Sequence, residues 1–167
     1  MTTSGEKWFL VGIQMLMFRG INEVILDAKG RMAIPTRYRS LLEEEDNSKL
    51  VVTIDTEDKC LLLYPFLVWE EIEKKVEALP SFNKLTRRIQ RLLIGHATEV
   101  EFDGNGRILV PPLLREYAHL DKNVILVGQG KKFEIWAKEV WDSGRDAWLA
   151  EGLSAKELPS ELQSLSL

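Results

Sequence analysis

The sequence predicts an α+β protein, mainly β with short helices, that is built from two internal repeats. The pattern Asp-x-x-Gly-Arg, followed by three mainly apolar residues and Pro, occurs at 27–35 and again at 103–111. A second block at 59–69 aligns with 131–141 in the same order. Apolar residues alternate with other residues on both sides of each Asp-x-x-Gly-Arg pattern, as in half-buried strands. Two blocks matched in one order indicate a duplicated structural unit.

The repeats divide the 167-residue chain into five expected segments. An N-terminal extension precedes the first repeat, a linking helix joins the two repeats, and a C-terminal tail follows the second. Each repeat has roughly 60 residues, too few to bury its own strands well, so we expect the halves to interlock into one pseudo-two-fold unit. The five segments are 1–16, 17–79, 80–95, 96–150 and 151–167.

The strand–loop–strand pattern near the start of each repeat predicts a β-hairpin. Val24 and Leu26 precede the first loop, residues 27–30, and Met32 follows it with the same period of two. The second loop, residues 103–106, has equivalent apolar neighbours.

Each loop contains the residue types that a tight turn needs. Gly30 and Gly106 stand where a short hairpin loop requires a positive φ, which glycine adopts without steric cost. Asp27 and Asp103 can fold a carboxylate back onto loop N–H groups, as aspartates that begin turns do. We therefore expect both loops to be rigid turns.

After each loop, a Pro ends the strand, and the pattern continues as helix, strand pair and helix. The short helices are predicted at 36–42 and 113–117. The strand pairs are predicted at 50–54 with 60–64, and at 123–127 with 132–136. The closing helices are predicted at 66–78 and near Trp141, with a further helix at 82–93 between the repeats.

The net charge of −4 argues against a nucleic-acid partner until its distribution is considered. Residues 17–40 hold five basic side chains against two acidic ones, and residues 84–115 hold six against three. Residues 41–83 instead carry eleven acidic side chains against four basic ones. Because both positive segments contain a repeated loop, we expect one basic face and one acidic face.

The composition, 45% hydrophobic and 29% charged, is that of an ordinary globular protein. The apolar stretch 8–18 is interrupted and too short to cross a bilayer, and it lacks the features of a signal peptide. The single cysteine, Cys60, excludes an internal disulfide, favours a reducing compartment and fits a small core position. We expect a cytoplasmic protein without a membrane partner.

Two chemical roles for the loops are disfavoured. Residues 103–106 resemble the start of an EF-hand loop, but position twelve is Leu114 and the first loop lacks the second ligand. Catalysis would have to use His96, His119 or the one cysteine, and no nucleophile–base spacing accompanies them. We expect no enzyme activity, no metal or other cofactor and no small-molecule substrate.

The remaining role is an anion-facing arginine on a rigid loop. Arginine is planar, permanently charged and able to form two parallel hydrogen bonds to a phosphate or a guanine edge. For Arg31 by itself, a solvated charge beside its own aspartate is the favoured interpretation. The recurrence of the same arginine at Arg107 favours a function.

The run Met17-Phe18-Arg19-Gly20, the two Asp-x-x-Gly-Arg loops and the Pro after each loop resemble the MraZ family. That family comprises bacterial transcriptional regulators encoded at the head of the division and cell-wall gene cluster. The resemblance runs from Met17 to about Trp148. It implies a SpoVT/AbrB-type fold, a swapped-hairpin barrel made from two repeats. It also implies homo-oligomeric rings, octamers or larger, that bind short G-rich direct repeats upstream of their own operon and usually repress it.

The resemblance also assigns roles to loop residues. The expected contacts with double-stranded DNA are Arg31, Lys29, Arg107 and Asn105. The expected loop-shaping residues are Asp27, Gly30, Asp103 and Gly106. Because Asn105 stands where the first loop has Lys29, we expect the first loop to contribute more electrostatic affinity.

Ring assembly would reconcile DNA binding with the negative net charge of the chain. Several identical loops along one duplex turn weak contacts into avid ones, and tandem DNA repeats then match tandem subunits. A nucleoid location follows from that interpretation. The alternative is an AbrB-like oligomeric protein-interaction module, such as an antitoxin, for which the acidic middle and the amphipathic tail would dock a partner.

Overall fold

The computed structural model describes residues 17–46, 49–152 and 159–164. The expected N-terminal extension, 1–16, lies outside the described residues, as does part of the expected tail. Among the described helices, none is both long enough and apolar enough to cross a membrane.

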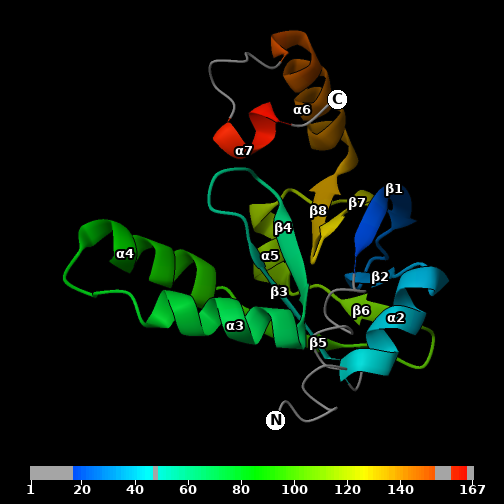
Figure 1. Cartoon of the computed structure of the whole chain (residues 1–167). Coiled ribbons are helices and arrows are strands. Elements are labelled where there is room, and N and C mark those ends of the chain that lie inside the picture. Colours follow the sequence, from blue (N-terminus) through cyan, green and yellow to red (C-terminus); the bar gives the residue numbers. More distant parts are fainter. Residues whose placement is uncertain (1–16, 47–48, 153–158, 165–167) are drawn as a thin grey trace.

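Strands and short helices alternate along the chain (Figure 1). The strands are β1 (Phe18–Ile25), β2 (Arg31–Ala33), β3 (Lys49–Ile54), β4 (Leu61–Pro65), β5 (Thr98–Glu101), β6 (Arg107–Leu109), β7 (Asn123–Gly130) and β8 (Phe133–Ala137). The helices are α2 (Thr36–Asp46), α3 (Phe66–Glu77), α4 (Lys84–Ile89), the π-helical turn η1 (Gln90–Ile94), α5 (Pro112–Tyr117), α6 (Lys138–Glu151) and α7 (Ser160–Gln163). The predicted class, strands with short helices from two repeats, is confirmed.

The strands form a six-stranded antiparallel sheet in the order β1-β7-β8-β4-β3-β5 and a two-stranded sheet of β2 with β6. The first strand of each repeat lies beside a strand of the other repeat, because β1 pairs with β7 and β5 pairs with β3. The main sheet is open, with β1 and β5 as its edges. The expected closure into a barrel is therefore absent from this sheet.

The prediction of a β-hairpin around each loop is wrong beyond the loop itself. Around the first loop, the strands before and after it meet only in a single bridge between Leu26 and Met32. β1 instead pairs with β7 over its whole length, and β2 pairs with β6. The physical reason is that the β2–β6 pair buries its central residues, Met32 and Ile108, in the core that the two repeats share.

The main core lies between the six-stranded sheet on one side and the β2–β6 pair with α2 and α5 on the other. Alternate residues of the central strands face opposite sides, so Leu50 and Val52 of β3 join this core while Val51 does not. On the opposite face, α3 covers Val51, Leu62 and Tyr64, and α6 covers a second cluster around Trp136. Both faces of the central strands are thus buried.

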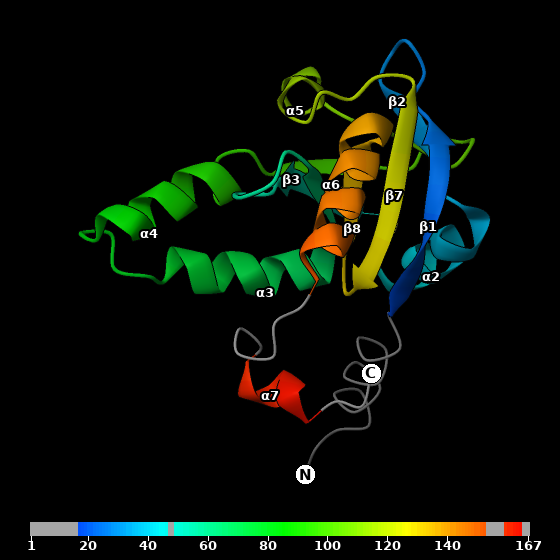
Figure 2. The same cartoon turned by 90° about the horizontal axis from the view of Figure 1, so that it is seen from above.

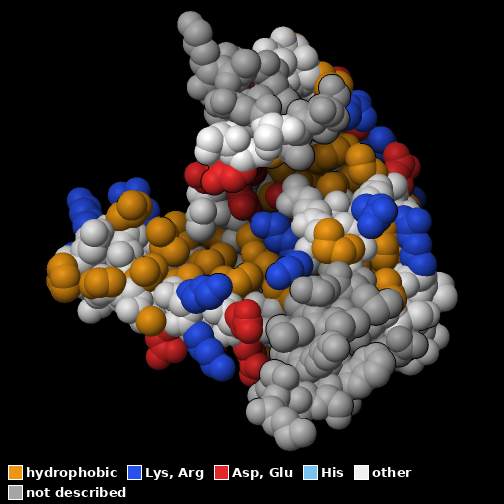
Figure 3. All heavy atoms as spheres, viewed as in Figure 1, with side chains coloured by type: hydrophobic (Ala, Val, Ile, Leu, Met, Phe, Trp, Pro, Cys, Tyr) orange, Lys and Arg blue, Asp and Glu red, His pale blue; other side chains and the backbone are white. Residues whose placement is uncertain are grey.

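The helices α3 and α4 form an arm that projects from the sheet (Figures 1 and 2). The Asn83 side chain caps α4 by accepting the backbone N–H groups of Leu85 and Thr86. Gln90 joins the two sides of the arm by donating from Nε2 to the Val76 carbonyl at 3.1 Å. Hydrophobic side chains lie along the arm's surface (Figure 3), and Phe82 at its tip is 87% exposed.

Candidate functional site

The first loop is closed by the carboxylate of Asp27. Its Oδ1 accepts the backbone N–H groups of Lys29 and Arg31, both at 2.9 Å. Its Oδ2 accepts Nε–H of Arg31 at 2.9 Å, so the aspartate also orients the arginine side chain. Gly30 completes the turn with a φ of +89°, a conformation that favours glycine.

The second loop repeats this arrangement atom for atom. Asp103 Oδ1 accepts the N–H groups of Asn105 at 2.8 Å and Arg107 at 2.9 Å, and Oδ2 accepts Arg107 Nε–H at 3.0 Å. Gly106 has a φ of +72°. The duplicated pattern in the sequence therefore corresponds to duplicated hydrogen bonding.

Hydrogen bonding lowers the pKa of both loop aspartates below the ordinary value of 3.8. The largest cause for Asp27 is the backbone N–H of Arg31, and for Asp103 it is the backbone N–H of Arg107. A carboxylate that accepts several N–H donors is stabilised in its charged form. Both aspartates are therefore ionised at neutral pH.

These shifts give a pH dependence that Asp27→Asn should remove. A group whose pKa is lowered by folding stabilises the folded state above its unfolded pKa, and loses that effect as pH falls through its folded pKa. The wild type should therefore be more stable than Asp27→Asn at pH 7. This advantage should shrink as pH falls below 3.8. Urea unfolding at pH 7 and pH 3 measures it.

Asp146→Asn is the matched control, since Asp146 is an exposed carboxylate on α6 beside Arg145. It should show little difference from wild type at either pH. A gap between wild type and Asp27→Asn that widens toward acid would contradict the assignment.

The β2–β6 pair holds the two loops next to each other. Met32 lies opposite Ile108 in this pair. Each loop glycine carbonyl accepts an N–H from the other repeat: Gly106 from Ile34 at 3.2 Å, and Gly30 from Val110 at 2.8 Å. In addition, Arg107 Nη1 lies 3.7 Å from Asp27 Oδ2. The two arginine loops form one continuous surface.

The predicted contact residues lie on that surface. Lys29 and Asn105 are exposed, and the side chains of Arg31 and Arg107 are 33% and 29% exposed. The first loop projects beyond the sheet near α5 (Figure 2). Arg31 makes no hydrogen bond or ion pair through its Nη atoms to a described residue. Arg31 is thus held through Nε alone, and an anion can approach its Nη atoms. Arg107 is held through Nε as well, but its Nη1 also lies 3.7 Å from Asp27 Oδ2.

The structure adds two arginines that the sequence interpretation missed. Arg39 on α2 packs against Gly106, and Arg115 on α5 packs against Gly30. The available signal was the repeat itself, because the two residues follow Arg31 and Arg107 at the same spacing.

One group of side chains in the described part of the chain has ligand atoms close enough for a metal ion: Asp55, Cys60 and Glu134, within 4.8 Å of one another. Asp55 Oδ2 already accepts two backbone N–H groups, and Glu134 Oε1 accepts the Trp136 indole N–H. Burial raises the pKa of the Cys60 thiol, which keeps it protonated. Since a metal ligand must be the thiolate, this group fits a packed core better than a metal centre.

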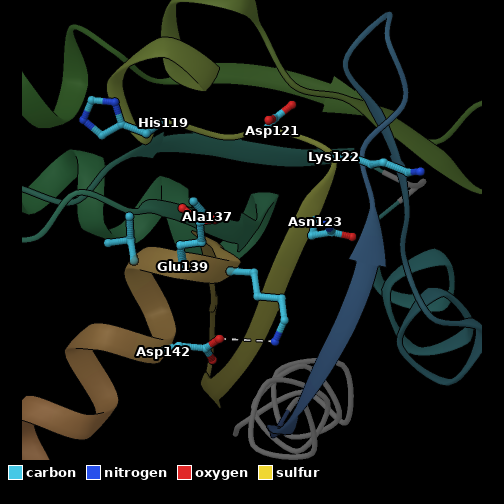
Figure 4. A pocket seen from close by; sticks show the side chains of 9 residues that line it. His119, Asp121, Lys122, Asn123, Ala137, Glu139 and Asp142 are labelled. Carbon is cyan, nitrogen blue, oxygen red and sulfur yellow. Dashed lines mark hydrogen bonds and ion pairs between the residues drawn. The ribbon is translucent and has the colours of Figure 1, made fainter.

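The largest of the described pockets, about 430 Å³, lies between the 119–123 segment and the start of α6 (Figure 4). Its polar side chains do not converge on one point: His119 and Lys122 point apart (Figure 4). Lys138 is bonded to Asp142 at 3.3 Å and to Glu23 at 3.0 Å. An active site needs several polar groups directed at the same reacting atom, which this lining does not provide.

Fold and site define a two-repeat, strand-based protein that presents paired arginine loops on one surface. The model of the family described as "MraZ protein, putative antitoxin-like" matches residues 17–92 and 93–157. The chain belongs to the MraZ family.

Curated relatives agree with that assignment. The chain is 62% identical to the transcriptional regulator MraZ of Coxiella burnetii (strain RSA 493 / Nine Mile phase I). It is 60% identical to that of Legionella pneumophila (strain Paris) and 54% identical to that of Halorhodospira halophila. Each match spans 152 residues, which is 90% of this chain and 100% of the relative. These names describe regulators of transcription, which are not a class of enzyme.

Proposed function

We propose that this protein is a transcriptional regulator that binds double-stranded DNA sequence-specifically, at direct repeats upstream of its own operon of division and cell-wall genes, and represses it. The names of its relatives support the regulatory role. The observation that carries the DNA-binding role is the pair of identically built arginine loops held side by side by β2 and β6.

Those loops suit an anionic ligand for physical reasons. An arginine whose Nε is already bonded to an aspartate loses less side-chain entropy on binding than a free one. Its Nη atoms can still donate to a phosphate or to the O6 and N7 edge of guanine. Arg31 and Arg107, with Lys29 and Asn105 beside them, would supply these contacts.

We further propose that the protein acts as a homo-oligomeric ring at the nucleoid. The net charge of −4 disfavours tight binding by one subunit. Repeated loops on several subunits raise the effective concentration of each loop at adjacent DNA repeats. The exposed apolar surface of the α3–α4 arm, with Phe82 and Leu85, is available for contacts between subunits.

Fluorescence anisotropy with DNA from upstream of this protein's own gene tests the proposal. The wild type should bind that DNA far more tightly than a scrambled duplex across a salt series, with a stoichiometry of several subunits per duplex. Lys29→Ala should reduce the slope of log K against log salt by about 0.9 for each phosphate that the lysine neutralises. The matched variant Asn105→Ala removes no charge and should leave the slope unchanged.

Equal affinity for both duplexes would reject the operator hypothesis. It would favour the alternative, a protein-interaction module, which the words "antitoxin-like" in the family description also suggest.

A further inference from the structure

Arg39 and Arg115 occupy equivalent places in the two repeats, and each contacts the loop of the other repeat. Arg115 belongs to the second repeat but packs against Gly30 of the first loop. Arg39 belongs to the first repeat but packs against Gly106 of the second loop. The exchange follows from the β2–β6 pair, which places each loop next to the helix of the opposite repeat.

The arginine side chain stands in the space that a Cβ on either loop glycine would need, so a larger residue there would have to displace it. A Cβ added to Gly30 would lie 2.6 Å from Cζ, 2.7 Å from Nε and 3.0 Å from Nη1 of Arg115. A Cβ added to Gly106 would lie 2.6 Å from Cδ of Arg39, with its Cζ and Nη1 closer still. The guanidinium group therefore fills the volume in which a side chain of the loop residue would stand.

Both guanidinium groups are buried at Nε, and neither Nε has a hydrogen-bond partner in the described structure. Arg39 donates from Nη2 to Thr36 Oγ1 at 2.9 Å, whereas the Arg115 side chain forms no hydrogen bond or ion pair with a described residue. A buried donor without a partner costs free energy, and a surface arginine could avoid that cost by turning outward. In both repeats, the arginine with the unpaired Nε is the one that packs against the loop glycine of the other repeat.

We propose that Arg39 and Arg115 are positioning residues that hold the opposite repeat's loop, so that Arg31 depends on Arg115 and Arg107 depends on Arg39. The part of this inference that concerns DNA rests on the proposed function. The charge of Arg115, which no described carboxylate pairs, also adds to the positive potential around Lys29 and Arg31.

Hydrogen–deuterium exchange without DNA tests the positioning directly. Arg115→Ala should speed exchange at the first-loop amides of Lys29 and Arg31 by about tenfold or more, and leave the second loop near wild type. Arg39→Ala should show the reverse. Arg87→Ala, an exposed arginine on α4, is the control and should change neither loop.

Arg115→Met, which keeps most of the side chain's bulk, is the second variant in case Arg115→Ala unfolds. It should still speed first-loop exchange relative to the second loop. The positioning role is overturned if Arg115→Met and a folded Arg115→Ala both leave the first loop at wild-type rates. It is also overturned if they act on the second loop instead.

A double-mutant cycle in the anisotropy assay separates positioning from direct DNA contact, since Arg115 also lines a pocket beside the first loop. Arg115→Ala should weaken operator binding about tenfold when it is introduced into the wild type or into the Arg107→Ala variant. Introduced into the Arg31→Ala variant, it should weaken binding less than about threefold. Equal reductions in all three backgrounds would overturn the positioning role and make Arg115 an independent contact. If the wild type shows no operator preference, the proposed function fails, while the exchange experiment still decides the positioning.

Discussion

The double variant Arg31→Ala/Arg107→Ala should bind operator DNA no better than scrambled DNA. Removing an arginine that bonds a base in bidentate fashion costs roughly 1–3 kcal/mol of discrimination, and about 1.4 kcal/mol corresponds to tenfold in affinity. Two such substitutions per subunit, multiplied over the several subunits of the proposed assembly, would exceed the usual gap between specific and non-specific binding. Anisotropy titrations at fixed salt measure the change.

The fold should survive that double variant. Each loop keeps its backbone hydrogen bonds, such as Asp27 N–H to the Arg31 carbonyl at 2.9 Å, which need no arginine side chain. A partly exposed ion pair contributes only about 0–1 kcal/mol. Arg145→Ala, on α6 and bonded to Asp146, is the control and should retain operator affinity. If the double variant still preferred operator DNA, the paired loops would not be part of the DNA interface.

Phe133→Ala should lower the free energy of unfolding by about 3–5 kcal/mol, the largest stability effect that we expect. Phe133 on β8 is fully buried, and its ring centroid lies 4.3 Å from that of Phe18 and 4.9 Å from that of Tyr38. Those partners belong to β1 and α2 of the first repeat, so the substitution opens a cavity where the two repeats meet. Since domains are stable by about 5–15 kcal/mol, this reduction is a large share of the total.

Urea unfolding at one fixed protein concentration measures that effect, because the proposed self-assembly would make apparent stability depend on concentration. Leu149→Ala, at a position on α6 that is 74% exposed, is the control and should stay within about 0.5 kcal/mol of wild type. A reduction under about 1 kcal/mol for Phe133→Ala would mean that the two repeats do not share one core.

Much of the local structure could be predicted from the sequence. The mainly apolar run at 50–54 predicts a strand, and β3 covers Lys49–Ile54. The helical spacing at 66–78 predicts α3, which ends within one residue of that range. Asp27 and Gly30 predict the turn of the first loop, whose hydrogen bonds join residues at most four positions apart. Such features depend on neighbouring residues, so the local pattern is sufficient to predict them.

The strand pairs within each repeat were predictable, because 50–54 with 60–64 and 123–127 with 132–136 are found as β3–β4 and β7–β8. The pairings between the repeats could not be predicted in this way. The hairpin expected around Val24 and Met32 is wrong because β2 pairs with β6 of the other repeat, while β1 pairs with β7, about a hundred residues further on. Arg39 and Arg115 follow Arg31 and Arg107 at the same spacing, but the sequence does not show what they contact. Their significance appears only once α2 and α5 lie against the opposite loops.

The order of residues along the chain is enough to specify two copies of one arginine loop, with the aspartate and glycine that shape it, because a tight turn is stabilised by hydrogen bonds between near neighbours. The packing of the two halves, in contrast, brings both loops onto one surface and sets each against an arginine of the other repeat. The reason is that a half of this size cannot bury its own strands well, so strands of one half pair with strands of the other.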